Sequence, residues 1–201
     1  MNFDSALAAS PVPLQIQRTF PGLPFEATAG SIILLCSYNI ALSSFHMEPV
    51  VSTLIRAWGD SAADLFVVKP KPEWHRIRPA GHGNDIEIGI PRKLYAAIES
   101  VEERLAPIYD EAEIFGIVGS SGAWAFWGDR SWGLAVLLAP AQSRPKLVDC
   151  GLFLDPFEDF VGDLTPVGYP RYLSDAFVQE FRRNVARVVS NGTGTAIYDS
   201  Q

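Results

Sequence analysis

The segment from Glu113 to Pro140, EIFGIVGSSGAWAFWGDRSWGLAVLLAP, constrains the fold more than any other part of this chain. It alternates apolar runs with two groups of turn residues, Gly119–Gly122 and Gly128–Ser131. Gly, Ser and Asp favour tight turns, and such groups between apolar runs are typical of consecutive hairpins. The segment therefore predicts an antiparallel meander. Its strands are expected at Ile114–Val118, Ala123–Trp127 and Trp132–Ala139.

Large aromatic side chains fall on both faces of the middle strand of this meander. Successive strand residues point to opposite faces, so Trp124 and Phe126 share one face and Trp127 lies on the other. A strand with bulky apolar groups on both faces is typical of the centre of a covered sheet. The pattern predicts that Trp124 belongs to the core.

Helical spacing of apolar residues marks three further segments, at about 47–58, 91–106 and 175–189. The last is the clearest, because Ser174 can cap it and Asp175 complements its N-terminal dipole. Its expected buried face consists of Phe177, Val178, Phe181, Val185 and Val188. Strands and helices do not alternate regularly, so the predicted fold class is α+β, a mainly antiparallel sheet (meander about 114–139) packed by about three helices.

The rest of the chain gives weaker signals. Leu65–Lys69 and Ile86–Ile90 are predicted strands. Ser31–Leu42 has the β-branched and aromatic content of a buried strand and also the length of a helix. Pro70–Asn84, rich in Pro and Gly, is predicted to be a loop. A short strand is possible at Leu152–Leu154.

Length and composition predict one globular domain. The chain has 201 residues, of which 48% are hydrophobic and 19% charged, enough for a sizeable core. Residues 1–30 are rich in Pro, Gly and Ala and are expected to form an irregular arm. The arm should pack through Leu14, Ile16, Phe20, Leu23 and Phe25.

Charge and cysteine content restrict the class of partner and the cellular compartment that we expect. A net charge of −7 argues against nucleic-acid binding and favours another protein as partner, and a basic protein is one option. The longest apolar run, Ile32–Leu42, is too short and polar to span a membrane. Cys36 and Cys150 give no disulfide framework, and no signal peptide is recognised. We expect two reduced thiols in a cytoplasmic protein.

The candidates for catalysis or metal binding are weak. His75, His82 and Asp85 lie in the predicted loop 70–85, but their spacing matches no metal motif, and polar surface is the favoured interpretation. The turn Gly119–Gly122 lacks the Gly-x-Ser-x-Gly spacing of a nucleophile elbow and is expected to be an ordinary hairpin turn. Cys36 is expected to be buried and inert. We predict no metal and no cofactor.

The predicted loop is also locally basic. Lys69, Lys71, Arg76 and Arg78 surround Trp74, a combination that could stack on a base or contact an anion. The patch is small within an acidic chain, so a solvated loop is favoured over a nucleic-acid site.

The second meander turn is the first candidate binding surface. Asp129 and Arg130 are expected at its tip, flanked by Trp127 and Trp132. Trp and Arg are enriched among residues that dominate binding energy. The alternative is a solvated turn whose tryptophans pack the sheet.

An acidic segment is the second candidate binding surface. Asp155, Glu158 and Asp159 alternate with Phe153, Phe157 and Phe160. Such a segment either serves solubility or docks a cationic partner, since acidic charge raises the association rate and aromatic rings anchor the contact.

These features together predict a non-catalytic protein that binds another protein through an acidic, aromatic-bearing surface. In general character the chain resembles small bacterial immunity proteins, which neutralise a toxin domain by occlusion and are acidic, α+β and rich in Trp. No motif ties it to a family. Two alternatives stay open: a small enzyme whose His/Asp site is built from 70–85 plus 128–131, and a subunit of a larger complex.

Overall fold

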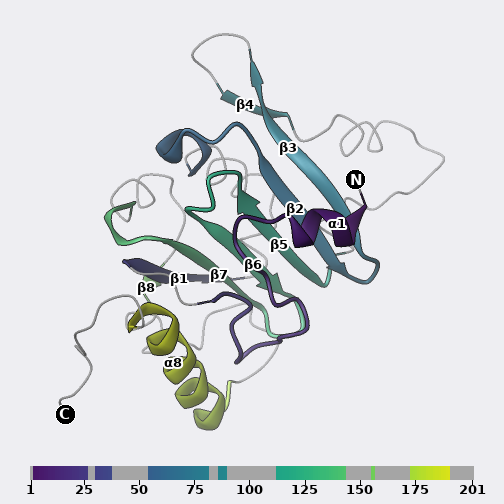
Figure 1. The fold of residues 1–201 in the computed structure, drawn as a ribbon. Coiled ribbons are helices and arrows are strands. Elements are labelled where there is room, and N and C mark those ends of the chain that lie inside the picture. The colour runs from purple at the N-terminus through teal and green to yellow at the C-terminus, as the bar shows by residue number, and fades with distance from the viewer. Residues whose placement is uncertain are drawn as a thin grey trace.

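One antiparallel sheet organises the chain (Figure 1). The computed structural model describes residues 2–26, 30–37, 54–81, 86–89, 112–143, 155–156 and 173–190. Within them the sheet has the strand order β4-β3-β2-β5-β6-β7-β1-β8. The strands are β1 (Ser31–Ser37), β2 (Ala63–Lys69), β3 (Glu73–Gly81), β4 (Ile86–Gly89), β5 (Ile114–Gly119), β6 (Ala125–Asp129), β7 (Leu134–Pro140) and β8 (Asp155–Pro156).

Helices complete the predicted α+β fold. The described helices are α1 (Phe3–Ala8) and α8 (Asp175–Ser190), with a 3₁₀ turn, η1, at Ala141–Ser143. Residues 54–58 are also helical, within the helix expected at 47–58, whereas the helix expected at 91–106 lies outside the described residues. The α+β class with a mainly antiparallel sheet is therefore confirmed.

The predicted meander is present as β5, β6 and β7, but its second half is shifted along the chain. The middle strand begins and ends two residues later than expected, and β7 begins at Leu134 rather than Trp132. Gly122 and Gly133 explain the shift, because their backbones have φ of 72° and 65°. Left-handed conformations of this kind belong to turns, so the turns end there and the strands begin after them.

Both faces of the meander are buried, as the sequence predicts. Trp124 and Phe126 belong to one hydrophobic cluster, and Trp127 to the other, and none is more than 1% exposed. We call these sides of the sheet the Trp124 face and the Trp127 face. They differ in what covers them.

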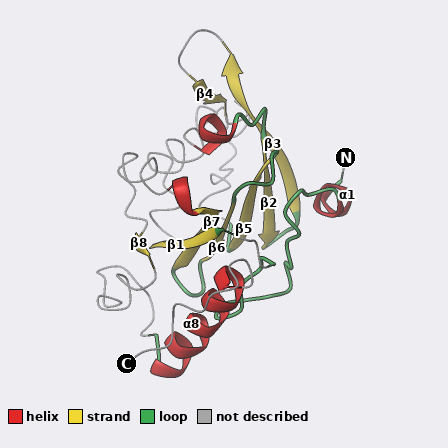
Figure 2. Cartoon of the chain, turned by 60° about the vertical axis from the view of Figure 1, so that its left-hand side comes forward, coloured by secondary structure: helices red, strands yellow, loops and turns green. Residues whose placement is uncertain are grey.

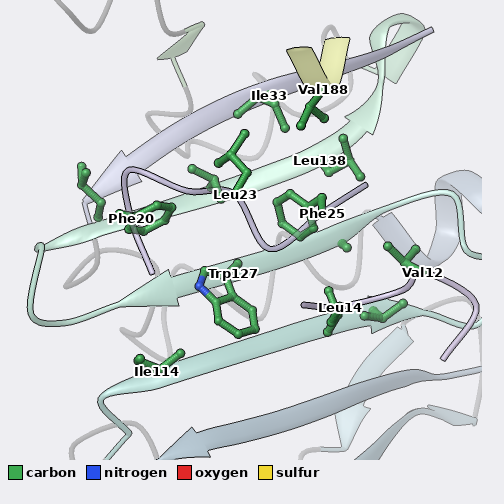
Figure 3. Close-up of a cluster of buried hydrophobic side chains, with 14 of the residues drawn as sticks. Val12, Leu14, Phe20, Leu23, Phe25, Ile33, Ile114, Trp127, Leu138 and Val188 are labelled. Carbon is green, nitrogen blue, oxygen red and sulfur yellow. The ribbon is translucent and has the colours of Figure 1, made fainter. Parts of the chain in front are cut away.

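The N-terminal arm and α8 cover the Trp127 face (Figures 2 and 3). Phe20, on the arm, packs edge-on against Phe181 of α8, with ring centroids 5.6 Å apart. Asn184 Nδ2 donates a 2.9 Å hydrogen bond to the carbonyl of Pro21 and ties the two segments together. The expected arm residues are buried, apart from the partly buried Ile16. Contrary to the prediction of an arm irregular throughout, its start forms α1, because the Asn2 side chain caps the backbone N–H of Ser5.

α8 follows the prediction closely. It begins at Asp175, and Ser174 Oγ accepts a 3.2 Å hydrogen bond from the backbone N–H of Phe177, which satisfies one of the free donors at a helix start. Phe177, Phe181 and Val188 are buried, and Val178 and Val185 are partly buried.

Leu54 and Ile55 pack on the Trp124 face, on the other side of the sheet from α8. The segment Ser31–Leu42, for which the sequence allowed a strand or a helix, begins as strand β1. This strand pairs with β7 along its whole length. The side chain of Cys36 and the segment Leu152–Leu154 lie outside the described part of the structure.

The prediction of a loop at Pro70–Asn84 is wrong, because most of this segment forms strand β3. Glu73–Ile77 pairs with β2, with Phe66 opposite Trp74. Pro70 and Pro72 precede the strand, and Pro79 lies beyond the last pair with β2, in the short ladder with β4, where it is opposite Ile88. No proline therefore interrupts the ladder between β2 and β3. Trp74 and Ile77 then supply ordinary strand-forming residues.

Candidate functional site

The turn between β6 and β7, residues 130–133, is held by hydrogen bonds at each of its residues. The backbone N–H of Arg130 donates to the carbonyl of Glu113 at 2.7 Å, and that of Trp132 to the carbonyl of Asp129 at 3.3 Å. The backbone N–H of Gly133 donates to the carbonyl of Arg130 at 3.1 Å. These hydrogen bonds constrain the backbone of the turn.

The side chain of Asp129 also holds this turn. Its Oδ1 accepts hydrogen bonds from the backbone N–H of Ser131 at 2.9 Å and from Ser131 Oγ at 2.5 Å. An Asp side chain that accepts from the backbone two residues ahead forms an Asx-turn, which fixes the start of a turn. Ser131 is exposed, and Arg130 is partly exposed.

Trp132 is fixed by a helix from the far end of the sequence. Its ring lies 4.4 Å from that of Phe177 in α8, at an interplanar angle of 31°. Trp132 is partly buried by this contact and keeps part of its surface in solvent. Arg130 and Trp132 are thus the two predicted binding residues that the structure presents together on one short turn.

Two of the predicted binding residues are not displayed. Trp127 is 0% exposed and Asp129 is 1% exposed. Asp129 is the last residue of β6, not part of the tip, and its side chain points to the Trp127 face, because it lies two residues beyond Trp127 on the same strand. The expectation that Asp129 is displayed at a loop tip is therefore wrong.

Trp127 and Asp129 each carry a buried polar atom without a hydrogen-bond partner in the described structure: Trp127 Nε1 and Asp129 Oδ2. Buried polar groups are nearly always hydrogen-bonded, so such a pair calls for an explanation. Figure 3 shows the nitrogen of the Trp127 ring directed toward the arrowhead end of its strand, the end that carries Asp129.

A second buried carboxylate, Asp60, is fully engaged. Its Oδ2 accepts a 2.8 Å hydrogen bond from Trp124 Nε1, and its Oδ1 accepts from Ser120 Oγ at 3.0 Å and from the backbone N–H of Ser121. The carboxylate joins the residues after helix 54–58 to the turn between β5 and β6. Sequence reasoning missed Asp60, since its partners are about 60 residues away and no local pattern marks it.

The carboxylate of Asp60 also explains why residue 119 is a glycine. A Cβ at this position would lie 2.6 Å from Asp60 Oδ2 and would collide with Trp124 Nε1. The serines of the turn accordingly serve this network. The expectation of an ordinary hairpin turn at Gly119–Gly122 agrees with the structure, in which the backbone N–H of Gly122 bonds to the carbonyl of Gly119 at 2.9 Å.

On β3 and just before it, two of the cations expected on a solvated loop, Arg76 and Lys71, are ion-paired. Arg76 forms a bidentate pair with Asp64, with Nε and Nη2 at 2.8 and 3.1 Å from the two carboxylate oxygens, and its guanidinium lies 5.5 Å from the ring centre of Trp74. The hydrogen bond to Asp64, and then the Coulombic attraction, raise the pKa of Arg76. Lys71 Nζ lies 3.4 Å from Glu73 Oε1. The side chain of Arg78 is not described.

His75 and Asp129 do not converge. His75 is paired with Leu65, which is paired with Ile117, which faces Phe126 on β6. Directly paired residues share a face, so His75 lies on the Trp124 face, whereas Asp129 lies on the Trp127 face. Three strand spacings, about 14 Å, also separate their strands. The charged neighbour of the imidazole is Glu73, whose Oε2 lies 3.5 Å from His75 Nε2.

The other predicted site residues are not placed. His82, Asp85, Glu158 and Asp159 lie outside the described residues, and of Asp155 the structure describes only the backbone, in β8 at one edge of the sheet. In the part of the chain that the structure covers, no group of His, Cys, Asp and Glu could hold a metal ion. None of the described helices is long and apolar enough to cross a membrane.

Comparison with known proteins adds no assignment: no family model, curated protein or solved structure matches this chain.

Proposed function

We propose that this chain is a non-catalytic protein that binds another protein, of the inhibitor or immunity type, and that the β6–β7 turn is the centre of its contact surface. The observation that carries the proposal is the fixed presentation of Arg130 and Trp132 on one turn. Three backbone hydrogen bonds, the Asp129 carboxylate and the ring of Phe177 hold this turn.

The chemistry of the two side chains suits an interface. Trp and Arg are over-represented among the interface residues whose truncation to Ala weakens binding by about 2 kcal/mol or more. Binding also costs about 0.5–1.5 kcal/mol for each side chain that must be immobilised. Because Trp132 is already packed on Phe177, much of that cost is met before the partner arrives.

Net charge supports the choice of partner. With −7 charges the chain attracts a basic protein at long range, which raises the association rate. The acidic residues Asp155, Glu158 and Asp159 belong to the proposed surface as predictions from the sequence. We place the protein in the cytoplasm, since Cys36 and Cys150 give no disulfide framework.

Affinity capture from the native cells tests the proposal. The wild-type chain should retain one basic partner in stoichiometric amount, and Arg130→Ala and Trp132→Ala should each lose most of it. Arg56→Ala is the matched control, because Arg56 is exposed and its helix packs on the opposite face of the sheet. Far-ultraviolet circular dichroism of each variant should match wild type.

Two outcomes would overturn the proposal. The first is the absence of a stoichiometric partner in the wild-type capture. The second is equal retention of that partner by the two turn variants and the control.

A further inference from the structure

Trp127 and Asp129 bury complementary hydrogen-bonding groups on the same face of β6, two positions apart. Trp127 Nε1 is a donor, and Asp129 Oδ2 is an acceptor, on side chains that are 0% and 1% exposed. Neither atom has a partner among the residues that the structure describes. Leaving a buried polar group unsatisfied is costly, and more so for a charged one, so the native protein is expected to supply a partner.

The spacing of the two residues indicates what that partner is. They lie two positions apart on β6 and point to the same face, which places their backbones about 6.7 Å apart. Side chains at such positions can approach each other more closely than their backbones, and one oxygen atom that makes two hydrogen bonds of about 2.8–2.9 Å joins a donor and an acceptor up to about 5.7 Å apart. It would accept from the indole N–H and donate to the carboxylate, as a water molecule can.

The environment limits the size of the partner. Ile114 and Leu134, apolar residues of the cluster that contains Trp127, stand directly opposite Asp129 on the neighbouring strands. Oδ2 is the buried oxygen of this carboxylate, so it accepts hydrogen bonds only from what is enclosed with it. Buried waters of this kind are a regular part of folded proteins and commonly satisfy polar groups that side chains cannot reach.

We propose that a buried hydration site, occupied by one water molecule, bridges Trp127 Nε1 and Asp129 Oδ2. Asp129 then acts in two directions: Oδ1 holds Ser131 of the turn, and Oδ2 connects through the water to the indole in the core. The site makes Asp129 a positioning residue for the β6–β7 turn. It goes beyond the proposed binding function and holds whether or not that function is correct.

The same chain provides an internal comparison. Trp124 Nε1 and Asp60 Oδ2 form a second buried indole–carboxylate pair, but they meet directly at 2.8 Å, because they come from different segments of the fold. One pair is therefore expected to be dry and the other bridged by water. Both indole N–H groups give separate signals in one protein NMR spectrum.

The test is the dipolar contact between each indole proton and water, measured on the ¹⁵N-labelled full chain. The Trp127 Nε1 proton should show a cross-peak to water whose NOE and ROE have opposite signs, as for a water that tumbles with the protein. The Trp124 Nε1 proton should show none. Ser131→Ala should keep the Trp127 cross-peak, which excludes relay through the exchangeable Ser131 hydroxyl close to Asp129.

Two variants make the inference falsifiable by stability as well. Trp127→Phe and Asp129→Asn should each raise the equilibrium constant for unfolding by a factor of about 5–30, and the double variant by much less than the product of the two. Absence of the Trp127 cross-peak in the wild-type protein would overturn the proposal. So would strictly multiplicative effects of the two substitutions, since a shared water couples them.

Discussion

Asp60→Asn is the substitution that best tests how the fold is held together. The change preserves the size of the side chain and replaces one carboxylate oxygen by an NH₂ group. Trp124 Nε1, Ser120 Oγ and the backbone N–H of Ser121 all donate to Asp60 in the native protein. Whichever way the amide turns, its NH₂ group faces at least one of these donors.

The magnitude follows from the number of bonds affected. A buried donor left unsatisfied costs about 1–3 kcal/mol, and hydrogen bonds to a charged group contribute about 1 kcal/mol more than neutral ones. One unsatisfied donor and two weakened bonds give a loss of about 3–5 kcal/mol in the free energy of unfolding. In a domain of this size 1 kcal/mol corresponds to about 2–4 °C in Tm, so Tm should fall by at least about 6 °C.

Equilibrium unfolding in urea, followed by tryptophan fluorescence, measures this loss. Asp4→Asn is the control, because it removes the same charge from an exposed position in the first turn of α1 and should cost no more than about 1 kcal/mol. Trp124→Phe removes the indole donor, so combining it with Asp60→Asn should cost at least about 0.5 kcal/mol less than the sum of the single changes. If Asp60→Asn unfolds within about 0.5 kcal/mol of wild type, the reasoning on this network is refuted.

Three further predictions concern the sheet and its helix. Gly119→Ala should destabilise by about 1–3 kcal/mol or more, since its Cβ would lie 2.6 Å from Asp60 Oδ2, and a thermal melt equal to wild type would contradict the geometry. Ser174→Ala should lower the free energy of unfolding by about 1 kcal/mol through loss of the α8 cap, and Ser174→Asp should restore it. Because the pKa of Arg76 is raised, the stability from its pair with Asp64 is complete below the unfolded pKa of Arg and lost only as pH rises through the folded value. Arg76→Lys should therefore change stability by the same small amount throughout the neutral range, and a difference that varies with pH there would count against the assignment.

The meander shows what sequence patterns could predict and where they fail. Alternation placed Trp124 and Trp127 on opposite covered faces correctly, because side-chain period is a local property of a strand. The exact turn positions depended on which glycine adopts positive φ, Gly133 rather than Gly128, and the residues alone do not decide this. The register error moved Asp129 from an expected exposed tip to a buried strand end.

Strand β3 and the buried carboxylates could not be predicted from the sequence for a different reason. Pro70, Pro72 and Pro79 favoured a loop, but they fall outside the pairs with β2, a fact that only the tertiary register reveals. Asp60 gains its importance from contacts with the β5–β6 turn about 60 residues away. By contrast, the β6–β7 turn carries Arg130 and Trp132 within three residues, so this part of the candidate surface could be recognised locally.

Parallel captures from the native cells test whether the β6–β7 turn is the contact surface for another protein. The quantity compared is the amount of basic partner that the wild-type chain, Trp132→Ala and the Arg56→Ala control retain. We expect one stoichiometric partner with wild type and with the control, and loss of most of it with Trp132→Ala. Full retention by a folded Trp132→Ala variant, or no stoichiometric partner for wild type, would contradict it.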